Sequence, residues 1–170
     1  VVALGFLGIN SLFTMNERQQ GLVLQFGEPK RVIKDSGLHV KLPIIQNTVK
    51  YDKRILEYDL PVEEVIAVDK KRMLLDSFTR FKITDPLEFY KTVGNESNVR
   101  NRLNSNVISS LRRVVGRVTL DELLSEERSK IMEDIKLEVN NEASRFGIEI
   151  VDVRIRRADL PEANSQAIYE

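Results

Sequence analysis

The chain of 170 residues and 19.5 kDa is long enough for one compact domain or two small units that share a core, and its 42% hydrophobic and 31% charged residues indicate a globular protein. A formal net charge of zero, 6% aromatic residues and no tryptophan argue against a nucleic-acid-binding or sugar-stacking surface. The absence of cysteine excludes disulfide and zinc–thiolate chemistry, and a single histidine, His39, cannot build a His-rich metal site.

The first segment, residues 1–13, carries no charge, and only Asn10 and Ser11 are clearly polar. A helix that spans a bilayer needs about 20 apolar residues, so this segment is too short to span alone. We expect residues 1–15 to be the C-terminal part of a transmembrane anchor; a buried N-terminal helix and a signal-peptide remnant are the alternatives. The apolar residues expected in the anchor are Val1, Val2, Leu4, Phe6, Leu7, Ile9, Leu12 and Phe13.

Residues 16–84 contain short runs in which apolar and polar residues alternate, which is the period of a half-buried strand. These runs cover residues 21–27, 38–42, 48–52 and 55–60. A hairpin is predicted from residues 65–68 and 73–83, joined by residues 69–72. On its long second arm, one face should carry Leu75, Ser77, Thr79, Phe81 and Ile83. We therefore predict a small antiparallel β-subdomain that lies next to the membrane.

Residues 85–160 show the longer period of helices. A short helix is expected over residues 87–91, because Pro86 suits a first helical turn. A second helix should carry an apolar stripe and end at Gly116; the stripe comprises Val99, Leu103, Val107, Leu111, Val114 and Val115. A third should begin at the capping box Thr119–Glu122 and continue to Phe146–Gly147.

A strand is predicted over residues 148–156, with Val151, Val153 and Ile155 on one face. Leu160–Pro161 should open a further helix over residues 161–170. The order of strands, helices, strand and helix indicates an α+β fold, in which an α/β subdomain over residues 85–160 follows the β-subdomain.

The residues offer no clear catalytic, cofactor or metal site. His39 lies in an alternating run without a second histidine or a cysteine, which favours a structural role. Adjacent acids such as Glu133 and Asp134 do not point into one pocket on a helix, and no glycine-rich phosphate loop is present. The alternative from another functional class is a hydrolase that uses Ser77 or Ser109 with a lysine.

The charge pattern indicates assembly or internal pairing. Residues 98–117 carry five arginines and no acid, whereas residues 121–142 carry eight acids and three bases. These helices either present solvated faces that pair within the domain, or pack head to tail between copies. The candidate assembly contacts are Arg100, Arg112, Arg113, Glu126, Glu127 and Glu133.

Several segments in order resemble the stomatin/prohibitin/flotillin/HflK–HflC family, the SPFH or band 7 family. They are residues 17–21, 24–27, 36–43, 51–54, 68–71, 81–86, 116–124 and 146–155, with Leu160–Pro161 and Ala167–Ile168 after them. Within the family the HflC branch is most similar, through residues 36–43, 75–77 and 147–154. An insertion carried by some HflC members is absent here, which leaves a stomatin-like or prohibitin-like identity open.

The resemblance implies an SPFH domain anchored by one N-terminal segment in the bacterial inner membrane, with its soluble domain in the periplasm. It implies a ring or cage built with an HflK-like paralogue, which encloses and restrains an FtsH-like membrane AAA protease. The partners expected are these proteins and membrane lipid, without nucleic acid or a cofactor. We therefore expect a non-catalytic scaffold; the rivals are a stomatin-like membrane organiser, the Ser–Lys hydrolase, and a soluble binding module whose apolar start is core.

Overall fold

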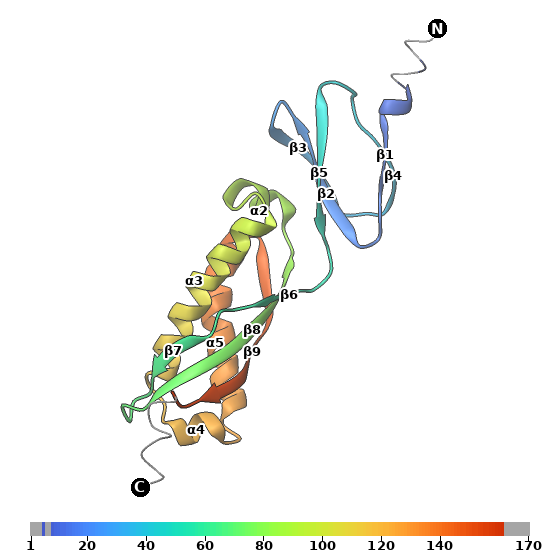
Figure 1. Ribbon diagram of the computed structural model, residues 1–170. Helices are drawn as coiled ribbons and strands as arrows, with labels where there is room; N and C mark the ends of the chain where they lie inside the picture. The colour runs from blue at the N-terminus through green and yellow to red at the C-terminus, as the bar shows by residue number, and fades with distance from the viewer. Residues whose placement is uncertain (1–4, 6–7, 162–170) are drawn as a thin grey trace.

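The computed structural model describes residue 5 and residues 8–161 and confirms an α+β fold (Figure 1). The strands are β1 (Leu12–Met15), β2 (Gln19–Gln25), β3 (Glu28–Ile33), β4 (Gly37–Val40), β5 (Gln46–Asp52), β6 (Leu56–Asp59), β7 (Glu63–Ile66), β8 (Arg72–Ile83) and β9 (Ile148–Asp159). The helices are α2 (Pro86–Thr92), α3 (Glu96–Val115), α4 (Leu120–Leu124) and α5 (Arg128–Ala143), followed by the 3-10 turn η1 (Ser144–Phe146).

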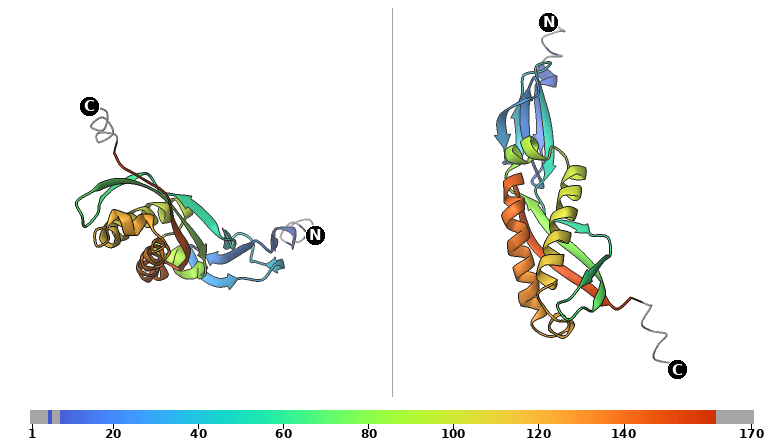
Figure 2. Two further views of the ribbon diagram at one scale, coloured as in Figure 1. Left: turned by 90° about the horizontal axis from the view of Figure 1, so that it is seen from below. Right: turned by 90° about the vertical axis from the view of Figure 1, so that its left-hand side faces the viewer.

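Strands β1–β5, residues 12–52, form a layered β-unit at one end of the molecule (Figures 1 and 2). A three-stranded antiparallel sheet, β3–β2–β5, faces the two-stranded sheet β1–β4. Successive side chains of β2 point to opposite faces of the three-stranded sheet. Leu22 and Leu24 join the main core, while Val23 packs with Met15 and Ile33 in a second cluster beneath β1 and β4.

Strands β6–β9 and the helices, residues 56–159, form the α/β unit. Strand β8 pairs with β6 and β7 along one edge and with β9 along the other. Helices α3 and α5 lie side by side on one face of this sheet (Figure 2). Every second residue of β8 from Met73 to Ile83 is buried, as the alternation predicted. The main core therefore lies between this face and the apolar stripes of α3 and α5.

The boundary between the two units differs from the one expected. The sequence placed it at residue 84, but β6, β7 and β8 belong to the sheet that the helices cover, so it falls between Asp52 and Leu56. Alternation identifies a half-buried strand without identifying the surface that buries it. The β-unit also begins earlier than residue 16, because Leu12 and Phe13 already pair with Val40 and His39.

Two further expectations are corrected. The single helix predicted after Thr119 is two helices, because Ser125 adopts an extended backbone and its hydroxyl accepts a hydrogen bond from the Glu127 amide. The capping box between Thr119 and Glu122 is confirmed. In β9 the buried set changes from Ile148 and Ile150 to Val153 and Ile155. A register shift in the pairing with β8 leaves Val151 between them and only half-buried.

Hydrogen bonds and a buried aromatic pair join the two units. The side-chain amide of Gln20 donates through Nε2 to the carbonyl oxygen of Ile83 at 2.5 Å, at the end of β8. The Tyr51 hydroxyl donates to the Gly94 carbonyl at 2.8 Å, and its ring meets Phe89 edge-on with centroids 4.9 Å apart. Burial, with a smaller contribution from Tyr90, raises the pKa of Tyr51 to about 12, so the phenol stays a hydrogen-bond donor at neutral pH.

Gly147 lies where β9 begins beside the end of β8 and the start of α2. Its carbonyl accepts hydrogen bonds from the Thr84 and Asp85 amides, at 2.9 and 3.1 Å. Its φ is +69°, and a Cβ here would overlap the Asp85 carbonyl oxygen and lie 2.9 Å from the Phe89 nitrogen. Glycine is thus required by both conformation and space.

We predict that Gly147→Ala destabilises the protein by more than about 2 kcal/mol, because the left-handed backbone costs an alanine 1–2 kcal/mol before any clash is counted. Gly94→Ala is the matched control, since Gly94 has φ +83° but its nearest Cβ neighbour would be 3.8 Å away. Urea denaturation measures both free energies of unfolding. Equal losses for the two variants would contradict the role assigned to the close approach at Gly147.

Candidate membrane and assembly surfaces

Exposed apolar side chains gather at the free end of the β-unit. Of the sixteen large hydrophobic residues that are exposed in the described part of the chain, nine lie between Ile9 and Ile45. Backbone hydrogen bonds bring their segments together: Lys41 donates to Ser11, Phe26 to Ile45, and Gln46 to Leu42. We call this set the apolar tip: Ile9, Leu12, Phe26, Val40, Leu42, Ile44 and Ile45. It lies at the end of the molecule farthest from α4 (Figure 1).

One part of the apolar tip is the turn between β2 and β3. Gln25 pairs with Glu28, so Phe26 and Gly27 form a two-residue hairpin loop. Both have positive φ, +52° and +85°, as a type I′ turn requires. Asn or Asp is usual at the first of these positions. Here an aromatic side chain occupies it and is 83% exposed.

The loop between β4 and β5 is the second part. The Leu42 amide donates to the Gln46 side chain at 2.8 Å, and the Gln46 amide donates back to Leu42 at 3.0 Å, which closes the loop. At its apex Ile44 has φ +76° and is 91% exposed. A β-branched residue with positive φ is a genuine conformational outlier.

Each turn places a bulky or β-branched side chain at an exposed position with left-handed backbone, where such residues are conformationally unfavourable. Such backbone strain costs of order 1–3 kcal/mol per site and is concentrated at functional sites. Phe26 and Ile44 contact water in the isolated chain, so burial in the domain does not explain them. An apolar surface outside this chain that buries the Phe26 and Ile44 side chains would explain why both residues occupy exposed turns.

The neutral chain has a strongly segregated charge. Residues 8–55 carry eight basic and four acidic residues, a formal net charge of +4, and the remainder carries −4. The basic residues are Arg18, Lys30, Arg31, Lys34, Lys41, Lys50, Lys53 and Arg54, and the acids are Glu17, Glu28, Asp35 and Asp52. Asp52 is bound by Arg54, whose hydrogen bond holds the pKa of this carboxyl below its usual value. The apolar tip therefore lies in a region of net positive charge, residues 8–55.

The residues expected in a membrane anchor fall into two groups. Val1, Val2, Leu4, Phe6 and Leu7 lie outside the described residues. Of the others, Ile9 is in a helical turn and 78% exposed, whereas Leu12 and Phe13 are in β1 and so belong to the β-unit. Phe13 faces inward against the cluster of Met15, Val23 and Ile33. Within the described part of the chain, no helix is long and apolar enough to cross a membrane.

The candidate assembly contacts are used partly within the chain. Arg113 forms an ion pair with Glu138 that links α3 to α5, and Arg112 reaches Glu63 of β7 at 3.0 Å. The guanidinium of Arg100 stacks over the Tyr58 ring, 5.7 Å from its centroid. Internal pairing thus accounts for both Arg112 and Arg113. Reversing these two charges would disturb contacts inside the domain as well as any contact between copies.

The acidic candidates are more accessible. Glu133 pairs with Lys136 one turn along α5, at 3.3 Å. Glu126 and Glu127 lie in the link between α4 and α5 and are exposed. Neither forms an ion pair with any residue that the structure describes. The α4–α5 link therefore has charge available for a partner, as do the exposed Asp121 and Asp134 of the same acidic segment.

The sheet face opposite the helices is covered by ion pairs. Asp152 of β9 accepts from Arg80 of β8 and from Arg154, both at 2.7 Å. Burial opposes ionisation of Asp152, but these hydrogen bonds outweigh it and lower the pKa of the carboxyl. Arg156 bridges Glu57 and Asp59 of β6 and lies over the Phe78 ring, at 4.5 Å from its centroid. This face is polar and internally neutralised.

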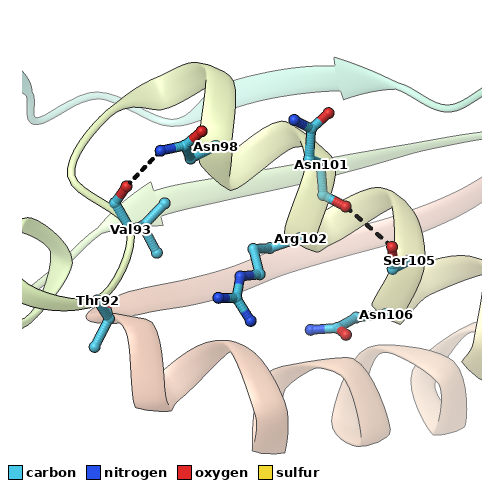
Figure 3. Close-up of a pocket in the computed structure, with 7 residues that line it drawn as sticks. All are labelled: Thr92, Val93, Asn98, Asn101, Arg102, Ser105 and Asn106. Atoms are coloured by element: carbon cyan, nitrogen blue, oxygen red, sulfur yellow. Dashed lines mark hydrogen bonds between the residues drawn. The ribbon is translucent and has the colours of Figure 1, made fainter.

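Two polar hollows lie along α3. The first, between the end of α2 and α3, has a volume of about 420 Å³ and is lined by Thr92, Val93, Asn98, Asn101, Arg102, Ser105 and Asn106 (Figure 3). Asn106 also lines a second hollow of about 330 Å³, beside Ser109 and Glu138. Figure 3 shows Arg102 and Asn106 pointing from α3 toward α5. Arg102 lies over the Phe146 ring, 5.2 Å from its centroid.

The serines considered for catalysis are placed without a base. Ser77 is buried on the inner face of β8, and the Ser109 hydroxyl donates to the Ser105 carbonyl one turn earlier at 2.8 Å. Within the described part of the chain, neither the Ser77 hydroxyl nor the Ser109 hydroxyl forms a hydrogen bond with a lysine amine. His39 hydrogen-bonds to the Asp35 carbonyl at 2.9 Å and packs against Phe13. These contacts are structural ones, and they provide no nucleophile–base pair.

Comparison with known proteins gives a consistent result. Residues 13–170 match the family model described as SPFH domain / Band 7 family. Protein HflC of Haemophilus influenzae is 30% identical over 172 residues, covering 95% of this chain and 58% of that protein. Modulator of FtsH protease HflC of Escherichia coli is 24% identical over 206 residues, covering 94% of this chain and 62% of that protein.

Stomatin-1 of Caenorhabditis elegans is 28% identical over 154 residues, covering 91% of this chain and 46% of that protein. The chain thus spans about three fifths of the length of these HflC proteins and less than half of the stomatin. The matched region includes the whole β-unit from Phe13 and the whole α/β unit.

We predict that the strain at the apolar tip is specific to its left-handed positions. Ile44→Gly should be more stable than Ile45→Gly by about 1–2 kcal/mol, because only the first removes a Cβ from a left-handed backbone. Both variants replace isoleucine with glycine and so raise the conformational entropy of the unfolded chain by the same amount. This contribution to the free energy of unfolding cancels when the two variants are compared. Denaturant midpoints of the two proteins measure the difference. Equal destabilisation by both substitutions would show that Ile44 is not strained.

Proposed function

The chain belongs to the SPFH domain / Band 7 family, and from this premise we propose that it is a non-catalytic, membrane-anchored scaffold that modulates an FtsH-type membrane AAA protease. The name of the Escherichia coli relative, a modulator of FtsH protease, supports the choice of partner. The observation that carries the membrane part of the proposal is the apolar tip, where Phe26 and Ile44 are exposed in strained turns. The placement of Ser77 and Ser109 without a base supports a role other than catalysis.

The proposed orientation follows from the shape of the molecule. The apolar tip lies at one end and the helical part of the α/β unit at the other (Figures 1 and 2). If the tip lies at the bilayer surface, α3, α5 and the α4–α5 link extend away from the membrane. Amphipathic elements bind an interface in proportion to the apolar area that they bury there. The anchor proposed from the sequence covers residues 1–15, and its residues before β1 would hold the tip at this surface.

The proposed assembly is a ring or cage made with an HflK-like paralogue. A closed ring needs a heterologous contact, in which two different patches of neighbouring copies meet. The acids Glu126 and Glu127, together with Glu133, are proposed for one patch, and Arg100, Arg112 and Arg113 for the other. Tethering in one membrane raises the effective concentration of the copies, so weak contacts suffice. The proposed location is the bacterial inner membrane, single-pass, with the soluble domain in the periplasm.

A second candidate function is that of a stomatin-like membrane organiser with other partners. The match to Stomatin-1 over 91% of this chain favours it. Both functions use the same apolar tip and the same lateral contacts. They differ in whether an AAA protease is bound.

We predict that cells that lack the full-length protein degrade membrane-embedded substrates of the FtsH-type protease faster than cells that carry it, because the scaffold restrains the protease. The wild-type gene and an Ile66→Ser/Leu124→Ser control should both restore the slower rate. These two residues are exposed apolar side chains of the α/β unit, far from the tip. A Phe26→Ser/Ile44→Ser variant should restore it less well, because its tip no longer favours the bilayer.

Pulse-chase half-lives of one membrane substrate measure this effect, and affinity isolation in mild detergent tests for the protease. Unchanged half-lives on deletion, with no AAA protease in the isolated complex, would reject the protease modulator in favour of the stomatin-like organiser. Full restoration by the tip variant would reject the role of the tip.

A further inference from the structure

A groove with cationic and apolar walls opens next to the apolar tip, between the two sheets of the β-unit. Its volume is about 300 Å³, and it is lined by Val23, Lys30, Arg31, Val40, Lys41, Leu42 and Gln46. Val40 and Leu42 also belong to the apolar tip, so the groove and the tip form one continuous surface. The three cations come from β3 and from the residue that follows β4.

Arg31 holds a central position in this groove. It pairs with Val23 across the β2–β3 ladder and so lies on the side of the sheet that faces β1 and β4. Its Nη2 atom donates to the Val40 carbonyl at 2.5 Å, which places the guanidinium across the gap between the two sheets. A guanidinium has five N–H donors, and this bond uses one of them.

The charges of the groove are mostly uncompensated. Lys30 occupies the register shift between β2 and β3, and its pair with Glu28, at 3.5 Å, is exposed and therefore weak. Neither Arg31 nor Lys41 forms an ion pair with any residue in the described part of the chain. Both cations lie within residues 8–55, whose formal net charge is +4. The groove therefore fits an anion that has an apolar part.

We propose that this groove binds the headgroup phosphate of an anionic phospholipid, with the acyl chains lying against the apolar tip. The proposal rests on the membrane contact proposed above and adds a lipid class to it. Arg31 and Lys41 bind the phosphate, and Val40 and Leu42 contact the start of an acyl chain. Arginine suits phosphate because its planar donors match two oxygens at once.

The apolar wall selects a lipid over other anions. A free phosphate would use the cations and leave Val40 and Leu42 exposed to water. A nucleic acid would need a basic surface with aromatic or base-reading groups, whereas the aromatic side chain of the tip, Phe26, lies on a hairpin turn beside aliphatic neighbours. A membrane surface presents the anion and the apolar phase side by side, which matches the arrangement of cations and apolar residues in the groove.

The test is flotation of the 170-residue chain with vesicles of phosphatidylcholine alone or of phosphatidylcholine with phosphatidylglycerol. The wild-type chain should prefer the anionic vesicles, and the preference should fall as salt is raised. Since each cation near an anionic surface contributes about fivefold in binding, Arg31→Gln/Lys41→Gln should reduce this preference roughly twenty-five-fold. Binding to the neutral vesicles should change little, because the tip and residues 1–11 are intact.

A matched control removes the same charge elsewhere. Lys70→Gln/Lys130→Gln changes two exposed lysines of the α/β unit and should keep most of the preference. Because Arg31→Gln also removes the bond to Val40, Lys41→Glu serves as a second variant that leaves this bond in place. Near-ultraviolet circular dichroism and unfolding curves verify that each variant is folded.

Each outcome has a defined meaning. Equal binding of the wild-type chain to both vesicles overturns this inference and leaves the proposed membrane contact standing, whereas no binding to either vesicle rejects that contact as well. An equal loss of the preference for anionic vesicles in the control variant would show that net charge alone causes the effect. That result would overturn the proposal that the groove binds the phosphate. Complete competition by inorganic phosphate at constant ionic strength would identify a site for a free anion instead of a lipid.

Discussion

The hydrogen bonds that β8 makes along both of its edges fix the positions of the other strands of the α/β unit. Its twelve residues pair with β6 and β7 on one side and with β9 on the other, and its inner face carries the core against α3 and α5. At its end, Ile83 pairs with Ile148 and also accepts the buried bond from Gln20. The β-unit is attached at this end and also, through Tyr51, to Phe89 and Gly94, so the orientation of the tip relative to the helices follows from β8 and α2 together.

This attachment explains how the tip can carry unfavourable turns. Strained residues persist only where the surrounding structure determines them, and here the three-stranded sheet is fixed from both faces by separate apolar clusters. The chain also separates its net charge, with +4 in residues 8–55 near the apolar end and −4 in the remainder. An apolar end with a basic body suits an anionic membrane surface, and an acidic outer part is repelled by it. Under the proposed function, this distribution of apolar surface and charge favours one orientation at a bilayer.

The sequence predicts the periodic elements of this fold well because each follows from local chemistry. The stripe from Val99 to Val115 in α3, the capping box at Thr119 and the alternating face of β8 are each confirmed. Strands β1 and β3 were not predicted, since β1 follows an uncharged segment and β3 contains Pro29 and three charged residues. The break at Ser125 and the register shift at Val151 depend on hydrogen bonds formed only in the folded chain. The tip was missed because its residues are spread over five segments, although Phe26–Gly27 and Pro43–Ile44 are unusual turn sequences that could have indicated it.

The central claim is that the apolar tip enters a membrane interface while the helical end stays in water. The chain has no cysteine, so an Ile44→Cys variant can carry one environment-sensitive fluorophore, and Leu124→Cys in α4 can carry the same probe at an exposed apolar position at the other end. Both are measured with anionic vesicles that contain nitroxide-labelled lipids. The account predicts a blue shift and strong quenching at position 44, with neither at position 124. Equal spectra and equal quenching at the two positions would contradict it.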